Sequence, residues 1–126
     1  MVYLWFYMVF CIITGDGFFA DKDLLYTECD AFIPKVRGLT ILNGGLAGAE
    51  ELALEYALER KLYIKKLYPD FSLHGAQAPY MRNEHMMRVA THMIAFVKSE
   101  KCNKVLSHLI KTAKNSRICL KIVLYS

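Results

Sequence analysis

The sequence has 126 residues, of which 55% are hydrophobic, 13% aromatic and 22% charged, and its formal net charge is +4 at pH 7. This length suits a single core, and this composition excludes a disordered chain. The four cysteines lie far apart in the sequence and form no Cys-x-x-Cys motif. We therefore expect one domain over residues 1–126, with reduced, mostly buried thiols in a cytoplasmic protein rather than a disulfide framework.

Residues 1–13 are almost wholly apolar or aromatic, but this run is too short to span a bilayer. No Lys or Arg precedes it and no small-residue cleavage site follows it, so we expect neither a signal peptide nor a membrane anchor. Residues 8–14 predict a buried strand. Residues 1–7 form an N-terminal extension that is an edge segment, a dimer contact or the product of an upstream start codon. An apolar segment on so small a domain favours a homodimer.

The rest of the chain alternates apolar runs with amphipathic helical patterns. The predicted strands are 8–14, 39–43, 63–68, 92–97 and 118–124, the predicted helices are 21–33, 51–60, 79–89 and 103–114, and 71–79 is predicted as a loop. This alternation predicts an α/β fold with a single doubly wound, mainly parallel five-stranded sheet. Ligands of such sheets bind beyond the carboxyl ends of the strands. We therefore expect residues 14–18, 43–50 and 98–104 to meet at a binding site.

A glycine-rich stretch, Asn-Gly-Gly-Leu-Ala-Gly-Ala-Glu from Asn43 to Glu50, joins the second predicted strand to the second predicted helix. A helix that starts after a glycine turn presents free backbone N–H groups, and glycine lets a ligand approach closely. We predict that phosphate binds the N–H groups of Gly45 and Gly48. Alternatively, the glycines only shape a tight turn. Glu50 either faces the cleft or is a first-turn acid favoured by the helix dipole.

A second notable stretch runs from Pro69 to Glu84 and places Arg82 and Asn83 in the first turn of a predicted helix. Arginine offers a planar fork for phosphate, and asparagine can bind a ribose hydroxyl or a base edge. We therefore predict that both residues bind the ligand. Alternatively, Arg82 pairs with Glu84 or another surface acid, and Asn83 points into solvent.

Basic residues are concentrated in the C-terminal part of the chain. From Lys98 onward there are seven Lys or Arg residues and one acid, Glu100, whereas the first 97 residues carry nine basic and eleven acidic side chains. Such a segment can bind nucleic acid or another anion, although lysines of this kind more often form the solvated face of a helix. The four histidines show no metal-ligand spacing with carboxylates or cysteines, so we expect no metal.

Taken in order, these motifs resemble the YspA-type, cpYpsA-related branch of the SLOG superfamily. Its members are Rossmann-like domains related to the Lonely-guy phosphoribohydrolases and to the nucleotide-like domain of DprA. The similarity runs from Ile12 to Val123 and is carried by Gly44, Gly45, Gly48, Ala49, Glu50, Pro69, Asp70, Phe71, Gly75, Pro79, Arg82, Asn83, Met86, Ala95 and Phe96. The resemblance implies a Rossmann-like fold that binds nucleotides or nucleotide-derived signals, with phosphate on the Gly44-to-Gly48 turn.

The chain departs from the family pattern at three places. After the first strand it has Gly15-Asp16-Gly17-Phe18 where relatives tend to have Gly-Ser-Arg-Asp, so a basic residue is missing and an acid has appeared. Val105-Leu106 stands where relatives have Gly-Thr, a second phosphate-holding turn. The Pro-Gly-Gly-x-Gly-Thr-x-x-Glu motif of the Lonely-guy enzymes is absent from the sequence, so their glycosidic hydrolysis cannot be carried over.

We therefore predict a domain that binds a nucleotide or nucleotide-derived ligand, ADP-ribose-like or a nucleoside monophosphate, as a sensor or carrier without a cofactor. The alternatives are a nucleotide N-glycosidic (phosphoribo)hydrolase, in which Glu50 is the catalytic residue, and a nucleic-acid-binding module. No pattern indicates a nucleophile with an adjacent base, and the question of catalysis stays open. The predicted ligand-binding residues are Gly15, Asp16, Gly44, Gly45, Gly48, Glu50, Arg82 and Asn83.

Overall fold

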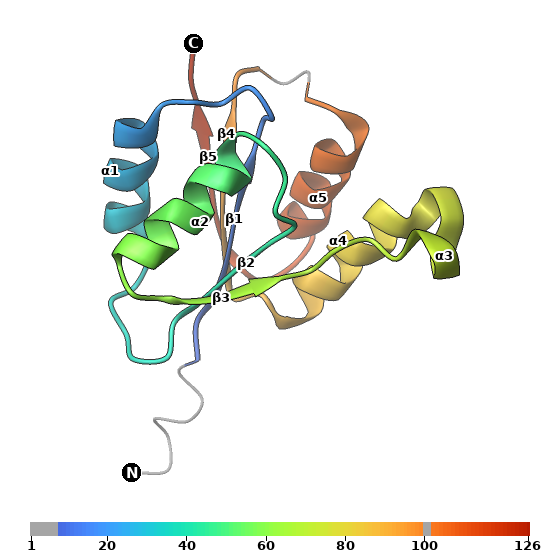
Figure 1. Cartoon of the computed structure of the whole chain (residues 1–126), viewed down its shortest axis with the longest axis horizontal. Helices are drawn as coiled ribbons and strands as arrows, with labels where there is room; N and C mark the ends of the chain where they lie inside the picture. The colour runs from blue at the N-terminus through green and yellow to red at the C-terminus, as the bar shows by residue number, and fades with distance from the viewer. Residues whose placement is uncertain (1–7, 100–101) are drawn as a thin grey trace.

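The computed structural model describes residues 8–99 and 102–126 (Figure 1). The strands are β1 (Phe10–Gly15), β2 (Thr40–Asn43), β3 (Tyr63–Lys66), β4 (His92–Val97) and β5 (Cys119–Leu124). The helices are α1 (Lys22–Phe32), α2 (Ala49–Glu59), α3 (Phe71–His74), the 3-10 helix η2 (Gly75–Gln77), α4 (Ala78–Val89) and α5 (Lys104–Lys114).

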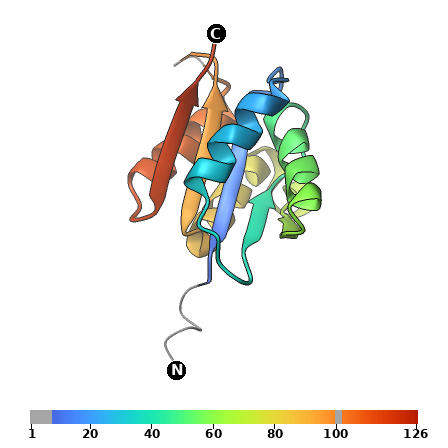
Figure 2. The same ribbon diagram turned by 90° about the vertical axis from the view of Figure 1, so that its left-hand side faces the viewer.

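All five strands run parallel in one sheet with the order β3-β2-β1-β4-β5 (Figure 2). Cys11 on the central strand lies opposite Ile41 of β2 and His92 of β4. The chain moves outward from β1 through β2 to β3, and then returns to β4 on the other side of β1. Open α/β sheets bind ligands outside the carboxyl ends of the strands at such a reversal. The predicted doubly wound parallel sheet is confirmed.

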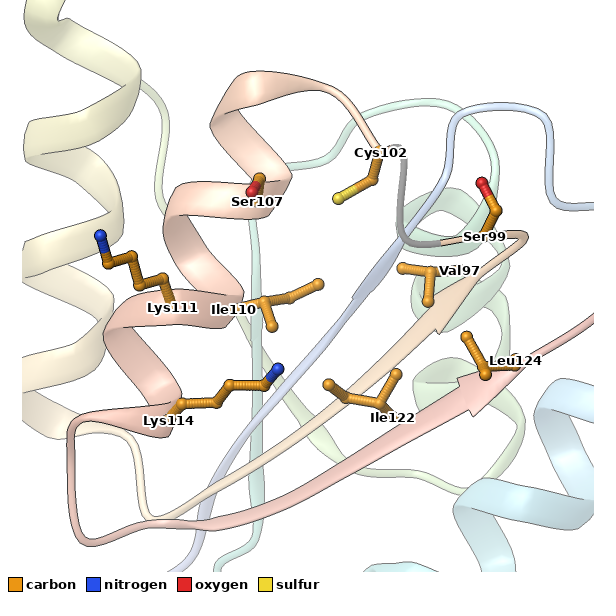
Figure 3. A pocket seen from close by; sticks show the side chains of 9 residues that line it. All are labelled: Val97, Ser99, Cys102, Ser107, Ile110, Lys111, Lys114, Ile122 and Leu124. Atoms are coloured by element: carbon orange, nitrogen blue, oxygen red, sulfur yellow. The ribbon is translucent and has the colours of Figure 1, made fainter.

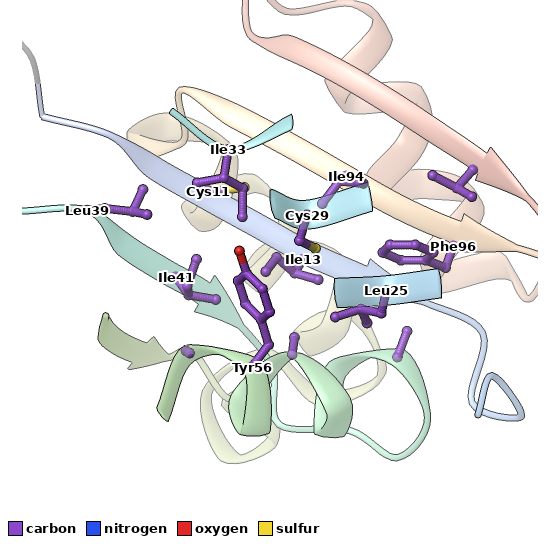
Figure 4. Packing of buried hydrophobic residues seen from close by; sticks show 14 of the residues in the cluster. Cys11, Ile13, Leu25, Cys29, Ile33, Leu39, Ile41, Tyr56, Ile94 and Phe96 are labelled. Carbon is purple, nitrogen blue, oxygen red and sulfur yellow. The ribbon is translucent and has the colours of Figure 1, made fainter. Parts of the chain in front are cut away.

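Helices cover both faces of the sheet, with α1 and α2 on one side and α4 and α5 on the other (Figure 1). Successive side chains of β1 face opposite layers, as the pleat of a strand requires. Cys11 and Ile13 pack in the layer of α1 and α2, which Figure 4 shows, whereas Ile12 packs in the layer of α4 and α5. None of the three has exposed surface. The unbroken apolar sequence of β1 is therefore that of a strand buried on both faces.

The helices that flank the carboxyl end of the sheet start in different ways. The side chain of Asp21 accepts a hydrogen bond from the Leu24 N–H at the start of α1, and Asn103 does the same for the Leu106 N–H at the start of α5. Helix α2 has Gly48 at its N-cap, with φ at 81° and no side-chain cap. Contacts of the preceding turn must therefore fix the start of α2.

The prediction of a loop at residues 71–79 is wrong, because the segment folds as α3 and η2 and leads directly into α4. The Asp70 carboxylate starts the first helical turn by accepting hydrogen bonds from Leu73 N–H (3.1 Å) and Ser72 Oγ (2.8 Å). Pro79 lies in the first turn of α4, where a missing N–H breaks no helical hydrogen bond. The glycine and proline that favoured a loop are accommodated at helix ends.

Two of the four cysteines are buried, Cys11 and Cys29, whereas Cys102 is partly buried and Cys119 is exposed. Burial in the apolar layer raises the pKa of both buried thiols, which keeps them protonated and unreactive. The predicted N-terminal extension, residues 1–7, lies outside the described residues. In the part of the chain that the structure describes, no helix is long and apolar enough to cross a membrane.

Candidate functional site

The segments that follow β1, β2 and β4 meet at the carboxyl end of the sheet, as the sequence predicts. The Asp16 carbonyl accepts a hydrogen bond from the Ala49 N–H (3.2 Å), and the Asp16 carboxylate accepts one from the Lys98 N–H (2.6 Å). A Cβ atom at Gly48 would overlap the backbone of Asp16 and Gly17. Gly48 is therefore required both for its positive φ and for the close approach of these two loops.

Glu50 turns its carboxylate back into the glycine turn and is buried there. Its Oε1 accepts hydrogen bonds from the N–H groups of Gly44 (2.8 Å) and Leu46 (3.3 Å), and its Oε2 accepts one from the hydroxyl of Thr14 (2.9 Å). These bonds link the loop after β2 to Thr14, near the end of β1. The carboxylate therefore occupies backbone donors of the turn and fixes its shape.

Asn43, the last residue of β2, holds the other side of the turn. Its Oδ1 accepts a hydrogen bond from the Gly45 N–H (2.9 Å), and its Nδ2 donates to the Glu50 carbonyl oxygen (3.0 Å). The sequence analysis did not select Asn43, although an asparagine directly before a glycine pair is a recognisable signal for a side-chain-supported turn. Among the described residues, the N–H groups of Ala47 and Gly48 have no acceptor, so they remain available to a ligand.

Arg82 of α4 reaches the same turn from the other side of the cleft. Its side chain passes directly over Gly44, where a Cβ atom would overlap Nη1. Nη1 donates to the Leu67 carbonyl oxygen (3.2 Å) and Nε to the Asn83 side chain (3.2 Å). Burial lowers the pKa of the Arg82 guanidinium and the nearby Glu50 carboxylate opposes this effect, but an arginine stays charged in either case.

Arg82 is 5% exposed, yet it forms no ion pair within residues 8–99 and 102–126. The ion pairs found there all join exposed or half-exposed side chains elsewhere, so the alternative of a surface pair with Glu84 is wrong. Asn83 is fully buried rather than directed into solvent, and its Nδ2 donates to the Val105 carbonyl oxygen (2.9 Å). Asn83 therefore lies on the buried side of Arg82, between Arg82 and the start of α5.

A cavity of about 520 Å³ opens between the glycine turn, the end of β3 and the start of α5, and Arg82 forms part of its wall. Two aromatic side chains on its rim are largely exposed, Tyr68 (64%) and Phe71 (59%), and Lys104 adds a second cation. Its lining residues are Gly44, Gly45, Leu46, Tyr68, Pro69, Phe71, Pro79, Arg82, Asn103, Lys104 and Val105. The combination of cations, aromatic surface and exposed backbone suits an anionic, ring-containing ligand.

The predicted site residues divide into two groups. Gly44, Gly45 and Arg82 line the cavity. The other five do not line it: Gly15 ends β1, Asp16 follows β1, Gly48 is the N-cap of α2, and Glu50 and Asn83 are buried. Asp16, for example, accepts a hydrogen bond from the Tyr125 hydroxyl (3.2 Å), which ties the loop after β1 to the end of β5.

Tyr68, Phe71 and Lys104 are among the cavity residues that were not predicted as site residues from the sequence. Phe71 was noted only as part of the family motif. An aromatic residue soon after an edge strand was a weak signal for Tyr68, and a lysine just after an asparagine N-cap was a weak signal for Lys104. Among the described residues, no group of three or more His, Cys, Asp or Glu side chains is placed to hold a metal ion.

A second hollow of about 440 Å³ lies between α5 and β5, away from the glycine turn (Figure 3). Apolar side chains form most of its floor, and Lys114 extends toward Ile122 (Figure 3). Its lining residues are Val97, Ser99, Cys102, Ser107, Ile110, Lys111, Lys114, Ile122 and Leu124. None of the predicted site residues lines this hollow, so we place the candidate site in the cavity beside Arg82.

Comparison with known protein families gives one match. The model of the YspA, cpYpsA-related SLOG family (YAcAr) matches residues 10–74. No curated protein and no solved structure matches the chain. The matched part runs from the start of β1 to the end of α3, so it includes the glycine turn and Phe71 but neither Arg82 nor Lys104.

Proposed function

The chain belongs to the YspA, cpYpsA-related SLOG family, and from this membership, which suggests a nucleotide-related role, we propose that it binds a nucleotide or nucleotide-derived ligand. The ligand is ADP-ribose-like or a nucleoside monophosphate, and the protein acts as a sensor or carrier. The phosphate lies against Arg82, at the wall of the 520 Å³ cavity.

The observation that carries this proposal is the buried charge of Arg82, which forms no direct ion pair among the described residues and is compensated only in part by the nearby Glu50 carboxylate. Removal of a cation from water is expensive unless an anion or several acceptors compensate. Arg82 has only two hydrogen-bond acceptors among the described residues, and its Nη2 donates to neither of them. An anionic ligand would supply the missing partner. A phosphate matches the planar fork of a guanidinium, with two parallel hydrogen bonds.

The remaining cavity wall supports the rest of such a ligand. Tyr68 and Phe71 offer aromatic surface on which a base can stack, and Lys104 offers a second positive charge near the phosphate. The free N–H groups of Ala47 and Gly48 lie at the start of α2, where a helix attracts anions, but neither residue lines the cavity. Contacts of a ligand with Tyr68, Phe71 and Lys104 would take over the role of the missing Gly-Thr turn, whose place is taken by Val105 and Leu106.

The geometry supports binding better than glycoside hydrolysis. Three donors already occupy the Glu50 carboxylate, and Glu50 is not among the residues that line the cavity. A hydrolase needs a carboxylate beside the reacting ribose carbon. The basic side chains of Lys111 and Lys114 lie at the second hollow, so a nucleic-acid surface on α5 is not part of this proposal.

Thermal-shift screening against AMP, NAD, ADP-ribose and cyclic nucleotides tests the proposal. A bound ligand at about a hundred times its Kd stabilises the fold by about 2.7 kcal/mol, which raises the Tm by several degrees. Lys104→Gln should weaken the shift, whereas Lys111→Gln, on the same helix but at the other hollow, should leave it unchanged. No shift with any of these compounds, or equal shifts in both variants, would count against the cavity.

A further inference from the structure

The side-chain amide of Asn83 has only one possible orientation in its site. Its Oδ1 accepts a hydrogen bond from Arg82 Nε, and its Nδ2 donates to the Val105 carbonyl oxygen. The Nε–H of an arginine can only donate, and a carbonyl oxygen can only accept. A reversed amide would lose both bonds, so the assignment of oxygen and nitrogen in Asn83 does not depend on His108.

His108 of α5 lies beside the nitrogen of that amide. Its Nδ1 lies 3.2 Å from Asn83 Nδ2, and its ring packs edge-on against Tyr80 with the centroids 5.1 Å apart. Because Asn83 Nδ2 is a donor, His108 Nδ1 must accept. The ring is therefore neutral in this arrangement and carries its proton on Nε2. A single amide thus connects His108 to Arg82.

We propose that His108 is a positioning residue that makes anion binding by Arg82 depend on pH. A proton on His108 Nδ1 would face the Asn83 amide hydrogens, so two donors would oppose each other. Asn83 would have to turn or move, and Arg82 Nε would lose its acceptor. Ligand affinity should therefore fall as His108 becomes charged. The predicted change in ligand affinity rests on the proposed function, whereas the link between His108 and Arg82 does not.

The two helices at this contact carry several other charged or titratable side chains. On α4 these are Tyr80, Arg82, Glu84, His85 and Arg88, and on α5 they are Lys104, Lys111 and Lys114. Most of them are cationic. His85 is exposed and its ring contacts that of His74 (6.5 Å between centroids), so it serves as a matched control histidine.

NMR on the full chain without ligand tests the link directly. The Arg82 Nε–H resonance should change together with the His108 ring resonances in a titration from about pH 8 to about pH 5. In His108→Gln, whose amide oxygen can accept but does not titrate, the Arg82 resonance should stay constant. In His85→Gln it should behave as in the wild type. An Arg82 resonance that ignores the His108 titration, or that still changes in His108→Gln, would overturn the proposal.

Calorimetry with ADP-ribose, whose phosphate groups keep the same charge over this range, measures the consequence for binding. The affinity should fall about tenfold between about pH 8 and about pH 5 in the wild type and in His85→Gln, and should stay constant in His108→Gln. Equal pH dependence in all three proteins would contradict the proposal. Failure of every variant to bind ADP-ribose at any pH would contradict the proposed function instead, and the NMR result would still decide the role of His108.

Discussion

A single methyl group at Gly44 should displace the Arg82 guanidinium and leave the rest of the fold intact. The added Cβ would overlap Arg82 Nη1 and would lie 3.1 Å from both Arg82 Cζ and Glu50 Oε1. Gly44 has no positive φ, so alanine can adopt its backbone conformation. The end of a long arginine side chain is the easiest of these groups to move. Gly44→Ala therefore changes the position of the charge without changing its identity.

The effect on binding should equal or exceed the effect on stability. Loss of one hydrogen bond from a charged group to phosphate costs about 1.5–3 kcal/mol, which corresponds to a ten- to 150-fold weaker affinity. In the folded protein, Arg82 would lose its bonds to Leu67 and Asn83. The smaller conformational freedom of alanine in the unfolded chain would return about 0.4–1 kcal/mol. We expect the free energy of unfolding to fall by about 2 kcal/mol or less.

The assay is calorimetry with the best compound from the thermal-shift screen, combined with urea unfolding of the same samples. Gly17→Ala is the matched control, because a Cβ at Gly17 meets no atom within 4 Å. It should bind as the wild type does. A folded Gly44→Ala protein with wild-type affinity would refute the reasoning, because the charge beside the turn would then contribute nothing to binding.

Three further predictions concern the turn, the surface and the N-terminus. Glu50→Gln should lower the free energy of unfolding by about 1–3 kcal/mol, because a buried acceptor is lost. Chromatography should find that the wild type releases no more free base from AMP than this variant does. Base release only in the wild type would revive the hydrolase alternative. The hydrogen bond from Arg60 lowers the pKa of Asp30, so the stabilising effect of this pair is present at neutral pH and is lost as the pH falls through the lowered pKa. Urea unfolding should show that the stability of Asp30→Asn falls less at acid pH than that of the wild type. An unchanged profile would exclude this pair as a source of acid sensitivity. We also propose that residues 1–7 support a homodimer, so light scattering should find a dimer for the full chain and a monomer for a chain starting at Met8; a monomeric full chain would contradict this.

The sequence was sufficient to predict the strands and the layers, because hydrophobic periodicity reports burial directly. The bounds of β4 agree with the prediction, since six consecutive buried or half-buried residues leave no ambiguity about a central parallel strand. The helical segment from Phe71 to Gln77 was missed, because the glycine and proline nearby favour a loop. The segment starts at the Asp70 cap, which is a local hydrogen-bond arrangement. Short capped turns carry too few apolar positions for a periodic signal.

The candidate site was only partly predictable for a different reason. The glycine turn is a local motif, so its place after β2 followed from the sequence. The contact of Arg82 with Gly44 depends on which face α4 presents across the cleft, and no local pattern determines that. The same is true of the Glu50 carboxylate, which could have faced solvent but folds back onto the N–H groups of Gly44 and Leu46. Long-range packing decides these directions.

The central claim is that the buried charge of Arg82 binds the phosphate of a nucleotide-derived ligand, and calorimetry with ADP-ribose and AMP tests it most directly. The wild type should bind at least one of the two, and Arg82→Gln should bind it about tenfold more weakly or worse. Lys111→Gln, which removes a charge of the same sign at the second hollow, should bind normally. Equal affinities of the wild type and a folded Arg82→Gln protein would contradict the claim.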